Sequence, residues 1–161
     1  TNLKMNPPLR TAEDALALQA AVADGTVDCI VTDHAPHAAH EKDCEWEISY
    51  FGCIGLETSL PLMVTNMVRT NKLSYTGLVR AMAVNPRRIL RLAPVKIAAG
   101  YKADLTLFDP EKKVQITTEY FESKSKNSAF IGAELYGVAT DVFVDGKRVL
   151  ADEVVVPGGE K

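Results

Sequence analysis

The stretch VTDHAPH, residues 31–37, places an acid and two histidines directly after a short apolar run that begins at Val27. Near-continuous apolar runs of this length are typical of parallel strands that are buried on both faces. In parallel α/β folds, ligands gather at the carboxyl ends of the strands. Asp33 therefore lies where a metal ligand or a general base is expected, and the same position also suits a carboxylate that caps a helix or satisfies a loop.

A helix is predicted directly before this strand. Thr11 is a good N-cap with Asp14 three residues later, and Gly25 lies where a helix C′ residue belongs. The apolar stripe between them consists of Ala15, Leu18 and Val22. A helix followed at once by a buried strand is half of a βα repeat.

The rest of the chain changes character near residue 95. Residues 34–55 are predicted to form a long loop, which in a compact domain is usually functional or disordered. Helices are predicted over residues 56–69, 74–84 and 86–91, and short strands follow over 96–97, 103–108, 114–116, 130–135 and 138–144. Asp145-Gly146 is a strong hairpin signal. We therefore divide the chain into an α/β part, residues 1–95, and a small β part, residues 96–161.

Composition excludes several classes of protein. The chain is 47% apolar, with 21 acidic and 18 basic residues and a formal charge of −3, which predicts no nucleic-acid partner and no disorder. No apolar run reaches the ~20 residues that a membrane helix needs. The cysteines, Cys29, Cys44 and Cys53, are odd in number and lack C-x-x-C spacing, so buried free thiols in a reducing cytoplasm are expected.

His34 and His37 strengthen the metal interpretation of Asp33. Imidazole and carboxylate together suit zinc. Adjacent residues rarely bind one ion together, so one or two ligands are expected here, whereas a zinc site needs about four. His40 lies among charged loop residues and is expected to be solvated.

Two further stretches are candidate substrate contacts. Asn6 precedes consecutive prolines, which hold it on a rigid extended backbone, and its amide offers both donors and an acceptor. A plain turn asparagine is the alternative. Phe51-Gly52 would let backbone amides approach a ligand closely, although this signal is weak on its own. The basic stretch Lys124-Ser125-Lys126 is interpreted as a solvated loop.

Taken together, these motifs resemble the C-terminal portion of class I dihydroorotases, members of the amidohydrolase superfamily. The resemblance covers nearly the whole chain. It is carried by KMNPPLRT at 4–11, TDHAPH at 32–37 with Glu41-Lys42 following, FGCIGLETSLPL at 51–62 and KADLTLFDP at 102–110. It implies the C-terminal part of a (β/α)8 barrel followed by part of a small β-sandwich. It also implies reversible, zinc-dependent conversion of dihydroorotate and N-carbamoyl-L-aspartate in pyrimidine biosynthesis.

The resemblance also implies roles for individual residues. Asp33 would bind one metal, accept a proton from the attacking water and pass it to the leaving nitrogen, since zinc lowers the pKa of bound water to about 7. His37 and Asn6 would bind the substrate, and Phe51-Gly52 would contact it through the backbone.

The same resemblance places the remaining metal ligands upstream of Asn6. A barrel of ~250 residues cannot close within residues 1–95. We therefore expect this chain to be a fragment that needs the N-terminal part of the same enzyme, that is inert alone, and that belongs to a homodimer. Two alternatives stay open: an inactive scaffold partner of aspartate carbamoyltransferase, and a hydantoinase or allantoinase.

Overall fold

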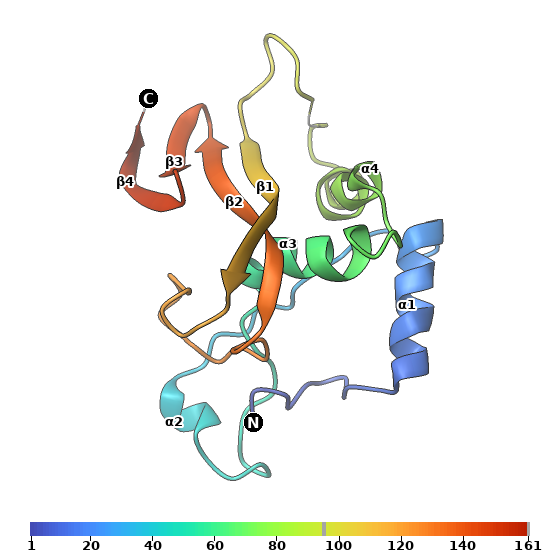
Figure 1. The fold of residues 1–161 in the computed structure, drawn as a ribbon, viewed down its shortest axis with the longest axis vertical. Coiled ribbons are helices and arrows are strands. Elements are labelled where there is room, and N and C mark those ends of the chain that lie inside the picture. The colour runs from blue at the N-terminus through green and yellow to red at the C-terminus, as the bar shows by residue number, and fades with distance from the viewer. Residues whose placement is uncertain (95, 161) are drawn as a thin grey trace.

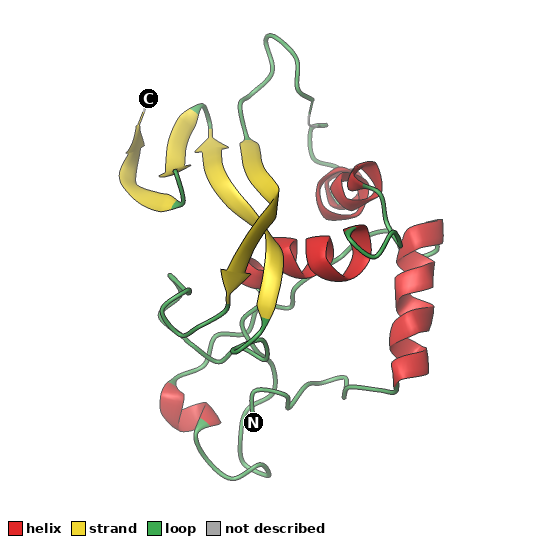
Figure 2. Cartoon of the chain, in the orientation of Figure 1, coloured by secondary structure: helices red, strands yellow, loops and turns green. Residues whose placement is uncertain are grey.

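The computed structural model describes residues 1–94 and 96–160, which form a set of helices and a four-stranded antiparallel sheet (Figures 1 and 2). The strands are ordered β1-β2-β3-β4, so each pairs with its neighbour in the chain. The helices are α1 (Ala12–Asp24), α2 (Ala39–Lys42), α3 (Leu56–Met63), α4 (Tyr75–Val79) and α5 (Asn85–Ile89), with π-helical turns η1 (Val64–Val68) and η2 (Arg80–Val84). The strands are β1 (Leu105–Gln115), β2 (Glu134–Val144), β3 (Lys147–Ala151) and β4 (Val154–Glu160). No helix in this part of the chain is long and apolar enough to cross a membrane.

Helix α1 begins and ends as its sequence predicts. The Thr11 side chain accepts from the Asp14 amide while the Asp14 carboxylate accepts from the Thr11 amide, and Gly25 closes the helix with φ of 86°. None of its residues is buried, and it lies on the far side of α3 from the sheet (Figure 1). Leu16 and Leu18 are 57% and 62% exposed. Val22 packs on the buried cluster that includes Val64, whereas the two exposed leucines have no such cover among the described residues.

The strand predicted over residues 27–32 does not form, and this prediction is wrong for the chain as described. Its backbone makes only isolated bonds, such as the Ile30 amide to the Ala81 carbonyl at 3.1 Å. A strand needs a neighbouring strand to complete its ladder, and none of residues 1–94 and 96–160 supplies one here. Val31 is 78% exposed as a result.

The three helices predicted downstream of the loop are confirmed, with π-helical turns continuing α3 and α4. Pro61 lies inside α3 and cannot donate to the carbonyl of Glu57 four residues earlier. The Tyr120 hydroxyl donates to that carbonyl instead, at 3.0 Å. The Glu57 carboxylate also accepts the amides of Glu122 and Ser123, which ties this loop to α3.

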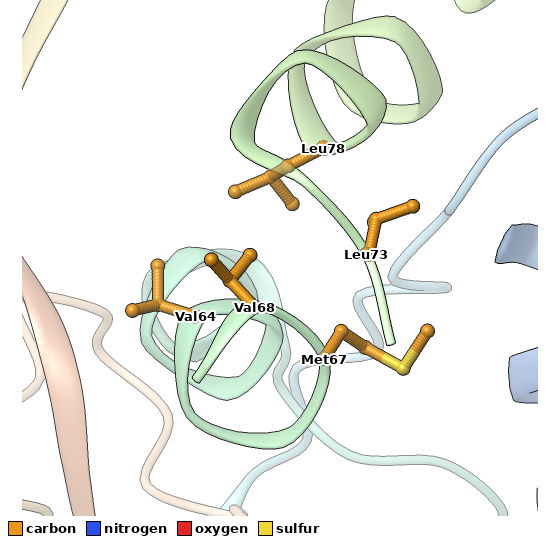
Figure 3. Close-up of a cluster of buried hydrophobic side chains, with 5 residues drawn as sticks. All are labelled: Val64, Met67, Val68, Leu73 and Leu78. Carbon is orange, nitrogen blue, oxygen red and sulfur yellow. The ribbon is translucent and has the colours of Figure 1, made fainter. Parts of the chain in front are cut away.

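Two apolar clusters form the core. The first consists of Val64, Met67 and Val68 of η1, Leu78 of α4, and Leu73 from the turn between them (Figure 3). The second contains Ile54, Ile116, Phe121 and Leu135. Each cluster draws on both sides of residue 95, since Phe108 and Tyr136 pack on the first. The helices and the sheet therefore share their core, and Val95 itself, the predicted boundary, lies outside the described residues.

Strand β1 is longer than predicted because it joins two predicted strands into one. Between Asp109 and Lys113 its register against β2 shifts, and Pro110 lies within this bulge, where a missing N–H is tolerated. The Asp109 carboxylate accepts the amides of Glu111 and Lys112. Opposite the bulge, Gly137 has φ of 95° and lies directly over the Val64 side chain.

The remaining β structure is partly as predicted. Asp145-Gly146 forms the expected tight hairpin between β2 and β3, with both residues at positive φ. The segment 130–133 is a turn, so β2 begins only at Glu134, and no strand forms at residues 96–97. Sequence patterns missed β4, which follows a second turn at Asp152-Glu153 with both residues at positive φ.

Replacing Gly137 by Ala should lower the free energy of unfolding, because the new Cβ would lie 2.7 Å from Val64 Cβ in a backbone that disfavours L side chains. Gly132→Ala is the matched control, since its φ is 93° and nothing lies within 4 Å of the added Cβ. Urea denaturation should show Gly137→Ala to be less stable than Gly132→Ala by about 1–3 kcal/mol. Equal losses of stability in the two variants would show that the close contact of Gly137 with η1 does not decide the effect of the substitution.

Candidate active site

Four of the five predicted site residues line one cavity of about 230 Å³. Three separate segments bring them together, with Asn6 from the N-terminal stretch, Asp33 after residues 27–32, and Phe51 and Gly52 from the long loop. The cavity is completed by Met5, Pro7, Thr32, Ala35 and Cys53.

Asp33 presents its carboxylate openly. The residue is exposed, and among the described residues its side chain has no hydrogen bond and no ion pair. Its backbone adopts φ of 46°, a conformation that aspartate tolerates better than most residues. Asn6 is also exposed, with no hydrogen bond to its amide in the described part of the chain. Both polar groups are free to meet a ligand.

His34 supports the loop. Its Nδ1 accepts the amides of Gly55 at 3.1 Å and Leu56 at 3.3 Å. These amides open α3 and have no partner within the helix. The imidazole therefore fixes the backbone beside Asp33 to the start of α3.

Gly52 is required by space as well as by backbone angle. It has φ of 97°, and a Cβ there would lie 2.7 Å from Ala35 Cβ. The two segments are also joined by the Ala35 amide, which donates to the Cys53 carbonyl at 3.0 Å. This close approach brings Phe51 and Gly52 beside Asp33.

His37 is not part of this cavity. Its Nε2 lies 2.9 Å from the Phe51 carbonyl oxygen, so the nitrogen is the donor, and its ring stacks on Tyr50 with centroids 5.4 Å apart. His37 instead lines another cavity, of about 600 Å³, together with Lys42 and Asn127. In this structure His37 braces the loop that carries Phe51.

Three buried polar side chains, which sequence reasoning did not single out, hold the loop in place. The Lys4 ammonium donates to the carbonyls of Trp46, Glu47 and Ser49 at 2.6, 3.0 and 2.8 Å. The Lys42 ammonium donates to Tyr50 at 2.7 Å and Gly52 at 3.0 Å, and burial lowers its pKa from the ordinary value. Both lysines lie in motifs that carry the family resemblance, Lys4 two residues before Asn6 and Lys42 after TDHAPH, but the motifs assigned neither of them a role.

Asn127 is the third of these side chains. Its Nδ2 donates to the Ala35 carbonyl at 2.9 Å, and its Oδ1 accepts the His37 amide at 3.2 Å. Its own carbonyl accepts the Ile54 amide. It follows directly after Lys124-Ser125-Lys126, which gave no local signal of this role. In that stretch Lys126 donates to the Phe121 carbonyl, so the stretch is not wholly solvated.

His40 and the three cysteines do not contribute to the candidate cavity with Asp33, except that Cys53 lines it. His40 is exposed, as expected. Cys29, Cys44 and Cys53 are free but only partly buried, which corrects the prediction of buried thiols. Within residues 1–94 and 96–160, no three His, Cys, Asp or Glu side chains gather closely enough to hold a metal ion.

The sequence profile of the amidohydrolase family matches residues 5–149, a range that contains all of the cavity-lining residues. The chain belongs to the amidohydrolase family. It is 44% identical over 153 residues to a dihydroorotase of Clostridium acetobutylicum, with 95% of this chain and 36% of that protein covered. It is 48% identical over 149 residues to a dihydroorotase of Geotalea daltonii, covering 92% and 35%.

Solved structures show the same fold. An L-hydantoinase from Arthrobacter aurescens superposes with a TM-score of 0.88 at 32% identity, covering 95% of this chain and 35% of that one. A D-hydantoinase from Thermus sp. gives a TM-score of 0.84 at 27% identity, covering 99% and 36%. The chain therefore spans about a third of the length of the amidohydrolases that it matches.

Replacing Asn127 by Ala should destabilise the protein by about 1–3 kcal/mol, because partly buried backbone groups of Ala35 and His37 lose their partner. Asn66→Ala is the matched control: its amide donates to the Leu62 carbonyl on an exposed helix face, and a change within about 0.5 kcal/mol is expected. Urea denaturation of the variants measures both. A loss no larger than that of Asn66→Ala would contradict the bracing role.

Proposed function

We propose that this chain is the C-terminal part of a dihydroorotase, an enzyme that opens and closes the ring amide between dihydroorotate and N-carbamoyl-L-aspartate. The observation that carries the proposal is the cavity in which Asn6, Asp33, Phe51 and Gly52 meet. The identity of 44–48% to dihydroorotases, over more than nine-tenths of the chain, supports the choice of substrate.

Residues 1–95 would supply the last part of a (β/α)8 barrel, and residues 96–161 part of a small β-sandwich. The exposed apolar side chains of α1 and of residues 27–32 support this assignment, since they need cover that the described residues do not give. In the complete barrel, residues 27–32 would gain neighbouring strands, and Asp33 would then stand at the carboxyl end of a strand.

Zinc is the cofactor that this proposal implies, and Asp33 fits the part of one ligand. Its carboxylate is exposed, unpaired and on the cavity wall, and carboxylate oxygens are accepted zinc ligands. The remaining ligands would come from residues outside this chain. When bound, zinc lowers the pKa of water to about 7 and polarises a carbonyl.

The chain's own residues would then bind, orient and move a proton. The Asp33 carboxylate would accept a proton during ring opening and return it to the departing nitrogen, because a carboxylate can act as base and then as acid in successive steps. The Asn6 amide would pair with complementary groups of the substrate. His37, through its bond to the Phe51 carbonyl, would hold the wall of the cavity and is a candidate contact for the substrate carboxylate.

A hydantoinase is the second candidate, favoured by the superposition on the Arthrobacter aurescens enzyme. Both reactions hydrolyse a cyclic amide. Rates on dihydroorotate and hydantoin, measured side by side in the complete enzyme, separate the two. Turnover of hydantoin without turnover of dihydroorotate would replace the proposed function by this one.

In the complete enzyme, with this chain joined to the preceding barrel residues, Asp33→Asn should lower kcat by at least about a hundredfold, because the amide cannot accept the proton. Asp43→Asn, in the same loop and exposed, is the control and should keep the parent rate. Dihydroorotate consumption and zinc content are measured on both variants. Full activity of Asp33→Asn would rule out the role of this carboxylate.

A further inference from the structure

The wall of the candidate cavity is built from a loop without regular structure. Residues 45–53 contain no helix or strand, so their carbonyl groups need partners from elsewhere. Lys4 takes three of these carbonyls, and Lys42 takes those of Tyr50 and Gly52. Side-chain ammonium groups thus replace the hydrogen-bond ladder that a strand would provide.

Lys42 is set apart by its burial and by the position of its two acceptors. The residue is only 5% exposed, and its ammonium bridges the carbonyls on either side of Phe51. Hydrogen bonds to a charged donor are about twice as strong as neutral ones. The two hydrogen bonds from Lys42 therefore fix two peptide units of the cavity wall.

The N–H groups of these same two units are free. The Tyr50 carbonyl shares its peptide plane with the Phe51 N–H, and the Gly52 carbonyl shares its plane with the Cys53 N–H. Neither N–H has a partner among the described residues, whereas the Gly52 N–H between them donates to the Lys4 carbonyl at 2.8 Å. Phe51 and Cys53 both line the cavity that contains Asp33.

In a trans peptide the carbonyl and the N–H point in opposite directions. A carbonyl drawn toward Lys42 therefore directs its N–H away from Lys42. The positive charge also polarises both peptide units, which strengthens the N–H groups as donors.

We propose that Lys42 is a positioning residue that presents the Phe51 and Cys53 N–H groups as a pair of donors for an oxygen of the substrate, a carboxylate or a ring carbonyl. This inference rests on the proposed function of the cavity. It assigns the pair to substrate binding, because Phe51 and Cys53 line the cavity that contains Asp33.

The test uses Lys42→Met in the complete enzyme, with KM and kcat for dihydroorotate measured separately. Methionine fits a buried site but removes the charged donor, and the two carbonyls keep only longer contacts, from Ser49 Oγ to Tyr50 at 3.4 Å and from Asn127 Nδ2 to Gly52 at 3.5 Å. KM should rise at least about tenfold while kcat stays within about threefold, the pattern of a lost binding contact. Lys42→Arg retains charge and donors and should give an intermediate KM.

Two matched controls separate positioning from stability. Val68→Ala removes volume from the first apolar cluster and lowers stability without touching the loop. Lys126→Met removes another ammonium that donates to a loop carbonyl, that of Phe121, outside the cavity wall. Both should keep the parent KM.

An unchanged KM in Lys42→Met, or a rise no larger than that of Val68→Ala, would overturn the inference. If Lys42→Met does not fold, Lys42→Arg decides: a KM raised about threefold or more supports positioning, and a parent KM overturns it. An enzyme that is folded, loaded with zinc and still inactive on dihydroorotate would instead overturn the proposed function, and the inference with it.

Discussion

The candidate site depends on residues 45–53, a loop that has no strand hydrogen-bond ladder and whose carbonyl groups must find other donors. A carbonyl that loses water without gaining a donor costs up to about 1–3 kcal/mol, and residues 45–53 present several carbonyls at buried or partly buried hydrogen bonds. Lys4 and Lys42 meet this requirement with charged donors that are themselves buried, and the carbonyl oxygens compensate the ammonium groups for lost water. The loop is consequently held at fixed points on both sides of Phe51.

Those fixed points are connected to the rest of the fold. Asn127 lies in the chain between Phe121 and Leu135 of the second apolar cluster and reaches back to the Ala35 and His37 backbone. The close contact of Gly52 with Ala35 leaves no space for a side chain. The sheet is in turn seated on η1 where Gly137 meets Val64. The β part thus supports the cavity wall through Asn127, which binds the backbone of Ala35.

Local signals predicted local structure well. The Thr11 capping box, the Gly25 C-cap and the Asp145-Gly146 hairpin each depend on a few neighbouring residues, and all three form. The meeting of Asn6, Asp33 and Phe51-Gly52 was predicted through family motifs. The roles of Lys4 and Asn127 could not be predicted, because their partners lie 42–92 residues away and no local pattern marks them. Residues 27–32 fail as a strand for a related reason: the partners that a buried strand needs are not among the described residues.

The central claim is that this chain holds one part of a shared active site. Ring opening of dihydroorotate by residues 1–161 alone, compared with the same residues joined to the N-terminal barrel part of a dihydroorotase, tests it most directly. The account predicts no activity above the uncatalysed rate for the chain alone and zinc-dependent activity for the joined protein. Hydrolysis of dihydroorotate by a monomer of residues 1–161 would contradict it.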